Sequence, residues 1–195
     1  MKKALPIILI IVVLVGIGGC SYNGMNSSRL QVDNAWASVQ SAYQRRADLI
    51  PNLVATVKGA ADFEKSTYVQ VAQARAGNLV NASKVPSEQL TPEKLAEIQK
   101  ANAEAQQAMR MAINVAIERY PDLKATANFT SLQDQLEGTE NRINVSRNGF
   151  NDAVQNYNRK VTNFPNNIMA GMFGFKPRAM FQADAGAQSA PKVQF

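Results

Sequence analysis

The residues with the clearest chemical potential are charged side chains at positions where packed helices normally bury apolar ones. A seven-residue repeat along residues 130–163 places Glu140 and Arg147 on a seam with valines, and Arg46 falls on a similar seam of residues 25–50. A charge inside a helical protein is tolerated only when it is paired and hydrogen-bonded. The sequence therefore predicts an arginine–carboxylate network between these two segments. Four charged residues nearby are expected to join it: Arg45, Asp48, Glu137 and Arg142.

This network has two interpretations. As a structural feature, it fixes the register of the helices and has no chemistry of its own. As a functional feature, it is a carboxylate-based site for catalysis or for a small ligand, built from Arg46, Glu140 and Arg147. Composition favours the first interpretation. The chain has no His and a single Cys, which excludes His/Cys zinc sites, Ser–His–Asp triads, di-iron sites with His ligands and an intrachain disulfide. We expect no metal, no cofactor and no enzymatic activity.

The N-terminal segment has the composition of an export signal or a membrane anchor. Two lysines precede an apolar run over residues 4–14 and a small-residue stretch over residues 15–19. Two fates remain open. One is cleavage and lipidation at Cys20, because Ile-Gly-Gly-Cys resembles a bacterial lipoprotein box, and the other is an uncleaved transmembrane helix. Both place the body on the periplasmic or extracellular side of a bacterial cell membrane, and an uncleaved N-terminus stays in the cytoplasm. Residues 1–20 are thus expected to be a signal or anchor segment.

The body is expected to be all-α, an antiparallel up-and-down four-helix bundle over residues 21–165. Proline and glycine are concentrated at a few breaks, which divide the body into helices of similar length. At the first break, Pro51 could kink one continuous helix, but we favour a tight corner at Ile50-Pro51. Residues 76–90 are expected to form a loop. The expected helices cover residues 25–50, 52–77, 92–119 and 130–163.

Two helix starts carry capping signals. Thr91 followed by Pro92 and an acidic residue predicts the start of the third helix. Thr130 and Gln133 have the spacing of a capping box and predict the start of the fourth helix. Large apolar residues then recur every seven positions and predict the buried faces of the first and fourth helices. They are Trp36, Tyr43 and Ile50, and Leu136, Ile143, Phe150, Tyr157 and Phe164.

Several short motifs occur in a fixed order along the chain. Three are continuous: Arg45-Arg46-Ala47-Asp48-Leu49-Ile50-Pro51-Asn52, Tyr120-Pro121-Asp122-Leu123-Lys124 and Thr139-Glu140-Asn141-Arg142-Ile143. The others are Asn128, Phe129, Asn151, Tyr157, Asn158, Phe164 and Pro165. Together these motifs resemble the LemA family, over residues 20–180. The resemblance implies a membrane-attached, mostly helical bundle in bacteria whose molecular activity is not established, and it brings no catalytic residues.

The segment after the fourth helix, residues 166–181, combines Phe and Met with basic residues. An up-and-down bundle returns the chain to the level of its N-terminus, so this segment is expected to meet the same bilayer or a partner's groove. The alternative is that its phenylalanines fold back over the open end of the bundle. The residues expected to make this contact are Ile168, Met172, Phe173, Phe175 and Phe181. Residues 182–195 are small and polar and are expected to be disordered.

Three functions follow from these features. The first is a non-enzymatic, membrane-attached scaffold or regulatory module with unidentified protein partners in the cell envelope. The second is a ligand-binding or enzymatic bundle that uses the charged seam, and the third is a self-assembling homo-oligomer. Nucleic acid is not an expected partner, because the net charge of +6 includes two lysines of the N-terminal segment and the remainder is small.

Overall fold

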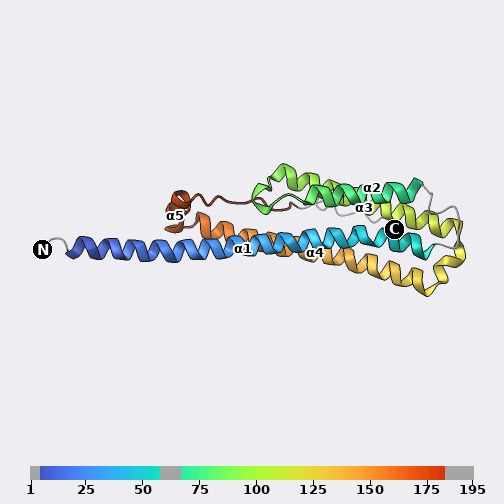
Figure 1. Cartoon of the computed structure of the whole chain (residues 1–195), viewed down its shortest axis with the longest axis horizontal. Helices are drawn as coiled ribbons and strands as arrows, with labels where there is room; N and C mark the ends of the chain where they lie inside the picture. Colours follow the sequence, from blue (N-terminus) through green and yellow to red (C-terminus); the bar gives the residue numbers. More distant parts are fainter. Residues whose placement is uncertain (1–4, 58–66, 183–195) are drawn as a thin grey trace, which may run out of the picture.

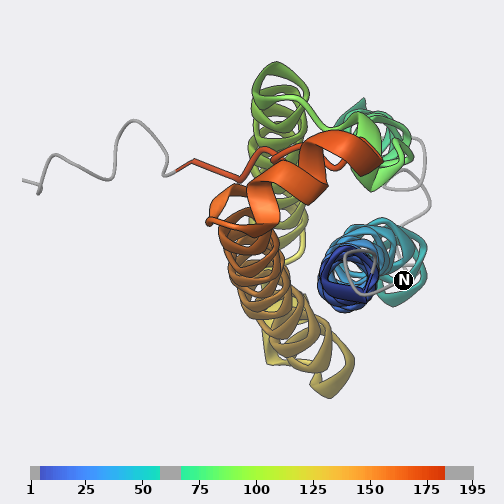
Figure 2. The ribbon, with the colours of Figure 1, turned by 90° about the vertical axis from the view of Figure 1, so that its left-hand side faces the viewer.

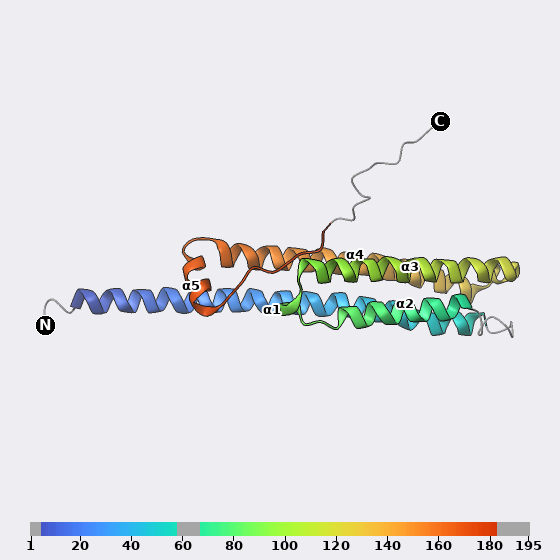
Figure 3. The ribbon, with the colours of Figure 1, turned by 90° about the horizontal axis from the view of Figure 1, so that it is seen from above.

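The computed structural model describes residues 5–57 and 67–182, with side chains described from residue 18 onward. Within these ranges the chain is all-helical, as the sequence predicts, and contains no strand. The long helices lie lengthwise in one extended body, and successive ones run in opposite directions (Figure 1, Figure 3). The α-helices are α1 (Leu5–Thr56), α2 (Thr67–Ser83), α3 (Pro92–Arg119), α4 (Ala127–Thr162) and α5 (Asn166–Phe173).

Helix α1 continues through Pro51, so the expected corner at Ile50-Pro51 is wrong. A proline inside a helix removes one backbone hydrogen bond and clashes with the preceding turn, at a cost of about 3 kcal/mol. Burial offsets this cost, because Ile50, Leu53 and Val57 share one side of the chain there and all three are buried. The expected second helix is wrong as a unit: its first residues end α1, residues 58–66 lie outside the described residues, and α2 begins at Thr67.

Helix α2 extends to Ser83, so the expected loop over residues 76–90 is wrong in its first half. Ala76 and Leu79 lie on successive turns of α2 and are buried, and this burial favours continuation of the helix. The connection to α3 is therefore short and contains one 3₁₀ turn, η1 (Ser87–Gln89).

The start of α3 is confirmed and the expected start of α4 is wrong. Thr91 caps α3, because its side chain accepts a hydrogen bond from the backbone nitrogen of Lys94 at 3.2 Å. A second 3₁₀ turn, η2 (Pro121–Ala125), leads into α4, which begins at Ala127. Thr130 does not cap it; its hydroxyl donates to the backbone oxygen of Thr126 at 3.3 Å, already inside the first turn.

The closed four-helix bundle expected from the sequence is not confirmed. Helix α1 packs against α4 and α2, and α2 packs against α3. Over the described residues, no Cα atom of α3 lies within 8 Å of one in α4, so the assembly is open between these two helices. Viewed from the end, the last part of the described chain runs across this open side (Figure 2). Near α5, the chain beyond that helix lies between α3 and α4.

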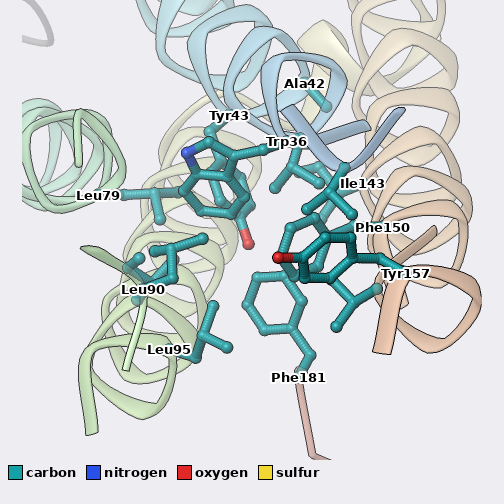
Figure 4. Close-up of a cluster of buried hydrophobic side chains, with 14 of the residues drawn as sticks. Trp36, Ala42, Tyr43, Leu79, Leu90, Leu95, Ile143, Phe150, Tyr157 and Phe181 are labelled. Atoms are coloured by element: carbon teal, nitrogen blue, oxygen red, sulfur yellow. The ribbon is translucent and has the colours of Figure 1, made fainter. Parts of the chain in front are cut away.

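Buried apolar side chains form two clusters along the body. The cluster nearer α5 contains Trp36 of α1 and Phe150 of α4, with Phe181 from beyond α5 inserted beside them (Figure 4). The ring centroids of Trp36 and Phe150 lie 5.4 Å apart. The cluster at the far end joins α1, α2, α3 and the start of α4. It contains Leu49, Ile50, Leu53, Val57, Val69, Ala72, Ala76, Ala108, Met109, Ala112, Ala116, Phe129 and Leu132.

Candidate functional site

A layer of polar side chains separates the two apolar clusters, and it brings part of the predicted network together. Arg46 of α1 forms an ion pair with Glu140 of α4. The other end of the same guanidinium donates to Oδ1 of Asn102 on α3 at 2.6 Å and to its backbone oxygen at 3.2 Å. Gln106, one turn further along α3, donates to Glu140 at 3.0 Å. We call these four residues the polar layer.

Burial sets the electrostatics of this layer. Arg46 is only 1% exposed, and desolvation lowers its pKa, although the adjacent Glu140 carboxylate opposes that shift. Glu140 itself is 30% exposed, so the ion pair is dry on the α1 side and open to water on the other. One turn away, burial raises the pKa of Tyr43 to about 12, and its hydroxyl has no hydrogen-bond partner within the part of the chain that the structure describes. The paired charges of the layer can fix the alignment of the helices, and the group that a molecule in solution can reach is the Glu140 carboxylate.

The other members of the predicted network lie elsewhere. Among the described residues, no carboxylate forms an ion pair with Arg147, and its guanidinium carbon lies 4.8 Å from the centre of the Phe181 ring. Arg45 and Arg142 line a shallow surface depression between α1 and α4. Asp48 accepts a hydrogen bond from Gln44 at 2.8 Å, on the solvent side of α1. The expected single network is therefore wrong for these four residues, because their positions on the helices face the surface or the tail.

A groove of about 760 Å³ follows the open side of the assembly, next to the polar layer. Its walls are α3 and α4, and its floor includes Met109, Ile113 and Leu136. Glu137, which the sequence assigned to the network, lies on its rim instead. We call it the α3/α4 groove. Its lining residues are Gln106, Met109, Arg110, Ile113, Asn114, Gln133, Leu136, Glu137, Glu140 and Asn144.

The chain beyond α5 fills the same opening nearer the α5 end, and two asparagines of α4 hold it by its backbone. Asn158 donates to the backbone oxygen of Arg178 and accepts from its backbone nitrogen, both at 2.8 Å. Asn151 treats Phe181 in the same way, at 3.0 and 2.9 Å. We call residues 174–182 the tail segment. The two asparagines of α4 bind backbone groups of this segment, so these contacts do not depend on which side chains the segment carries.

Side chains of the tail segment point into the protein. Arg178 donates to Asp33 at 2.8 Å and to the hydroxyl of Ser87 at 2.9 Å, which links α1 to the α2–α3 connection. Phe175 and Phe181 are 9% and 6% exposed. The expectation that these two phenylalanines contact a membrane or partner is therefore wrong, since both cover the core as in the alternative interpretation.

Helix α5 keeps an exposed apolar face. Ile168 and Met172 are 56% and 73% exposed, and the neighbouring Phe164 and Phe173 are also open to solvent. The helix lies against the part of α1 that follows the N-terminal apolar run. Tyr22 of α1 packs on Phe173 with ring centroids 5.1 Å apart. Sequence reasoning named this face but could not separate its exposed residues from the buried ones.

The remaining residues singled out by the sequence have structural positions. Cys20 is a free, exposed thiol on α1 beside α5. Asn52 is exposed near the end of α1, Tyr120 and Pro121 form the junction of α3 with η2, and Asn128 is exposed in the first turn of α4. Side chains before residue 18 and the expected disordered tail from residue 183 onward lie outside the described residues. Over the described part of the chain, no helix has a stretch long and apolar enough to cross a membrane.

Sequence reasoning missed the uncharged members of the site. Asn102 and Gln106 lie on α3 among alanines, where a polar residue normally indicates a solvent face. The signal that could have found Asn151 and Asn158 is their spacing of seven residues, the repeat that also governs the apolar positions of α4.

Comparisons with known proteins match most of the chain. A family model described as "LemA family" matches residues 35–195. Over 193 residues the chain is 24% identical to Protein LemA of Metamycoplasma hominis, covering 93% of this chain and 83% of that protein. A stretch of 66 residues is 32% identical to Magnetosome protein MamQ 2 of Paramagnetospirillum magneticum, covering 34% of this chain and 24% of that protein. The family match includes the polar layer, the α3/α4 groove and the tail segment.

Proposed function

Since the chain belongs to the LemA family, we propose that it is a non-enzymatic, membrane-attached interaction module whose helical body stands outside the cytoplasmic membrane of a bacterium. The body offers surfaces for protein partners in the envelope, and the polar layer fixes the register of the helices that carry them. The observation that carries the proposal is the exposed apolar face of α5, because α5 lies beside the part of α1 that follows the N-terminal apolar run.

The position of α5 relates it to the N-terminal apolar run. Ser21 of α1 donates to Asn166 at the start of α5 at 2.9 Å, and Tyr22 packs on Phe173. Residues 4–19 are apolar or small, so α5 lies directly beyond the end of the segment expected to enter the membrane. An exposed face that holds Ile168 and Met172 at this level fits the headgroup layer of the same bilayer.

The polar layer supports a structural role for the charged seam. The Arg46 guanidinium of α1 pairs with Glu140 of α4 and donates to Asn102 of α3. It therefore connects three helices at one level. Removing one partner of a buried pair leaves an uncompensated charge, so the pairing penalises any slip of α1 against α4 or α3. A layer of this kind stabilises one register without chemistry.

Fluorescence quenching in proteoliposomes tests the membrane contact with the full chain. In a Cys20→Ser background, an environment-sensitive dye is attached at Met172→Cys or at Ser131→Cys, the latter at the far end of α4. Quenchers carried by lipid headgroups should quench the dye at position 172 and leave the dye at 131 unaffected. Equal accessibility of both dyes to a water-soluble quencher, with neither dye quenched from the lipid, would refute the membrane contact.

Mass spectrometry of the N-terminus from native membranes tests the attachment itself. A chain that begins at a lipidated Cys20, or one that retains residues 1–19 and stays in the membrane fraction, supports the proposal. A mature chain recovered in the soluble fraction without residues 1–19 or a lipid contradicts it. Crosslinking on the same membranes identifies the neighbouring proteins.

A further inference from the structure

A small pocket lies where the tail segment leaves α5 and runs back along the body (Figure 1). Its volume is about 320 Å³, and its walls belong to α1, η1, α4 and the tail segment itself. We call it the tail pocket. Its lining residues are Arg29, Glu88, Tyr157, Gly174, Phe175, Lys176, Pro177 and Arg178.

The charged side chains of the tail pocket are mostly positive. The cations that line it are Arg29, Lys176 and Arg178, and the carboxylate that lines it is Glu88. Arg178 is already compensated, because it pairs with Asp33 at 2.8 Å and its second terminal nitrogen lies 3.7 Å from Glu88. Both carboxylates therefore serve the same cation. Arg29 and Lys176 form no ion pair with any residue that the structure describes.

Arg29 is a half-buried cation without a counter-charge. One of its terminal nitrogens donates to Oδ1 of Asn26 at 2.8 Å, and its guanidinium carbon lies 5.8 Å from the centre of the Phe175 ring. Its Nε is buried and bonds to no acceptor in the described part of the chain. A buried donor without an acceptor costs free energy, so this wall of the pocket lacks an acceptor or an anion.

Two neutral donors lie in the same place. The backbone N–H of Lys176 makes no hydrogen bond within the described ranges. Tyr157 is only 2% exposed, and its hydroxyl bonds to none of the described residues. Burial raises the pKa of Tyr157, so the phenol stays protonated and can donate, and it lies close enough to Arg29 and Arg178 for both to act on it electrostatically.

We propose that the tail pocket is a binding site for a phosphate group, whose oxygens are held by Arg29 and Lys176 with the Tyr157 hydroxyl as a neutral donor. Guanidinium, ammonium and N–H groups are the usual ligands of phosphate oxygens in proteins. Here they come from three segments, which are α1, α4 and the tail segment. A phosphate presents three acceptor oxygens to such a set, whereas a carboxylate presents two.

Two sources can supply the phosphate: a soluble phosphate ester and a lipid headgroup. Arg29 follows Ser21, which contacts the start of α5, by eight residues, or about 12 Å along the helix. A headgroup layer is about 5–8 Å deep, so a bilayer at the level of α5 leaves the pocket above that layer. This spacing favours a soluble phosphate. Phosphate binding requires only the pocket, and it holds whether or not α5 contacts a bilayer.

Equilibrium dialysis of radiolabelled inorganic phosphate against the full chain in non-ionic detergent tests the site. Saturable binding is expected, and excess acetate should not displace it. Lys176→Gln should weaken binding about tenfold, and Arg29→Gln at least as much, because each removes a charged donor. Glu88→Gln should strengthen binding several-fold, since it removes negative charge from the pocket. Arg45→Gln, which changes an exposed arginine of α1 outside the pocket, is the matched control and should bind like the unmodified chain.

The same dialysis in vesicles of phosphatidylcholine and phosphatidylglycerol separates the two sources. Phosphate binding that persists in the vesicles assigns the site to a soluble phosphate. Binding that is present in detergent and lost in the vesicles assigns the same site to a lipid headgroup, which then occupies it.

Two results would overturn the proposal. One is the absence of saturable phosphate binding in detergent. The other is binding with the same affinity in the unmodified chain, Lys176→Gln and Glu88→Gln. Both of these variants change exposed side chains, so they test the site even if Arg29→Gln does not fold. Circular dichroism establishes that each variant is folded.

Discussion

Replacing Glu140 by Gln should destabilise the protein by about 3 kcal/mol, because it leaves the buried Arg46 guanidinium without its counter-charge. The substitution keeps the size of the side chain and one carbonyl oxygen, so the loss comes from charge rather than from a cavity. Arg46 is 1% exposed and cannot recover the lost interaction by turning toward water.

Several features set the magnitude. Breaking a buried pair costs about 3–5 kcal/mol. Asn102 still accepts from Arg46 at 2.6 Å, and Glu140 is 30% exposed, so the lower end of that range applies. For a chain of this length, about 3 kcal/mol corresponds to a fall in the melting temperature of about 6–12 °C.

The assay is urea and thermal unfolding of the full chain in detergent, followed by far-ultraviolet circular dichroism. Glu104→Gln is the matched control, because Glu104 pairs with Arg75 at 2.6 Å on the surface, where an ion pair contributes less than about 1 kcal/mol. The double variant Arg46→Met/Glu140→Leu should recover most of the loss, since it removes both buried charges. Equal stability of Glu140→Gln and Glu104→Gln would refute the reasoning.

Three further predictions concern the tail, a buried phenol and the tryptophan. Gly174 has φ 75°, so Gly174→Ala should cost about 1 kcal/mol in urea unfolding, whereas Gly171→Ala, inside α5 with equally open space, should be neutral or stabilising. Burial raises the pKa of Tyr43 from 10.0 to about 12, so the folded protein retains a proton that the unfolded chain releases. The free energy of unfolding should therefore fall by about 2–3 kcal/mol as the pH rises through this interval. Urea titrations of Tyr43→Phe should lack that part of the decline. Trp36 donates from its indole nitrogen to the backbone oxygen of Val85 at 2.8 Å, so Trp36→Phe should cost about 1–3 kcal/mol in the same assay, and an unchanged midpoint would exclude that bond as a contributor.

The helical class, the third helix and most of the buried face of the fourth helix could be predicted, because local signals determine them. Phe164 is the exception: it was expected on that face, but it lies beyond the end of α4 and is 80% exposed. Thr91 and Pro92 define a helix start through their own backbone geometry, and Phe150 and Tyr157 recur with the period of one buried face. The continuation of α1 through Pro51 could not be predicted in this way. It depends on the burial of Ile50 and Leu53 against other helices, which outweighs a local penalty.

The ion pair of the candidate site could be predicted from the sequence, because a buried charge requires an opposite one. The hydrogen bonds between uncharged groups could not. A buried Arg46 requires a carboxylate, and Glu140 lay on the seam expected to face it. Arg147 was expected to pair with a carboxylate of the same network, but its guanidinium lies over the ring of Phe181, and that contact depends on the path of a segment 34 residues further along the chain. Amide pairings such as Asn158 with the backbone of Arg178 leave no charge pattern in the sequence to follow.

The unbroken course of α1 also has a mechanical consequence. Its 52 residues form a rod of about 78 Å, and the rod contacts α2, α3, α4 and α5. Its first turns and the turns that carry Arg46 and Leu53 belong to one continuous helix, which Pro51 does not interrupt. We therefore expect a rotation of the first turns of α1 to alter the packing around Leu53 at the far end of the body.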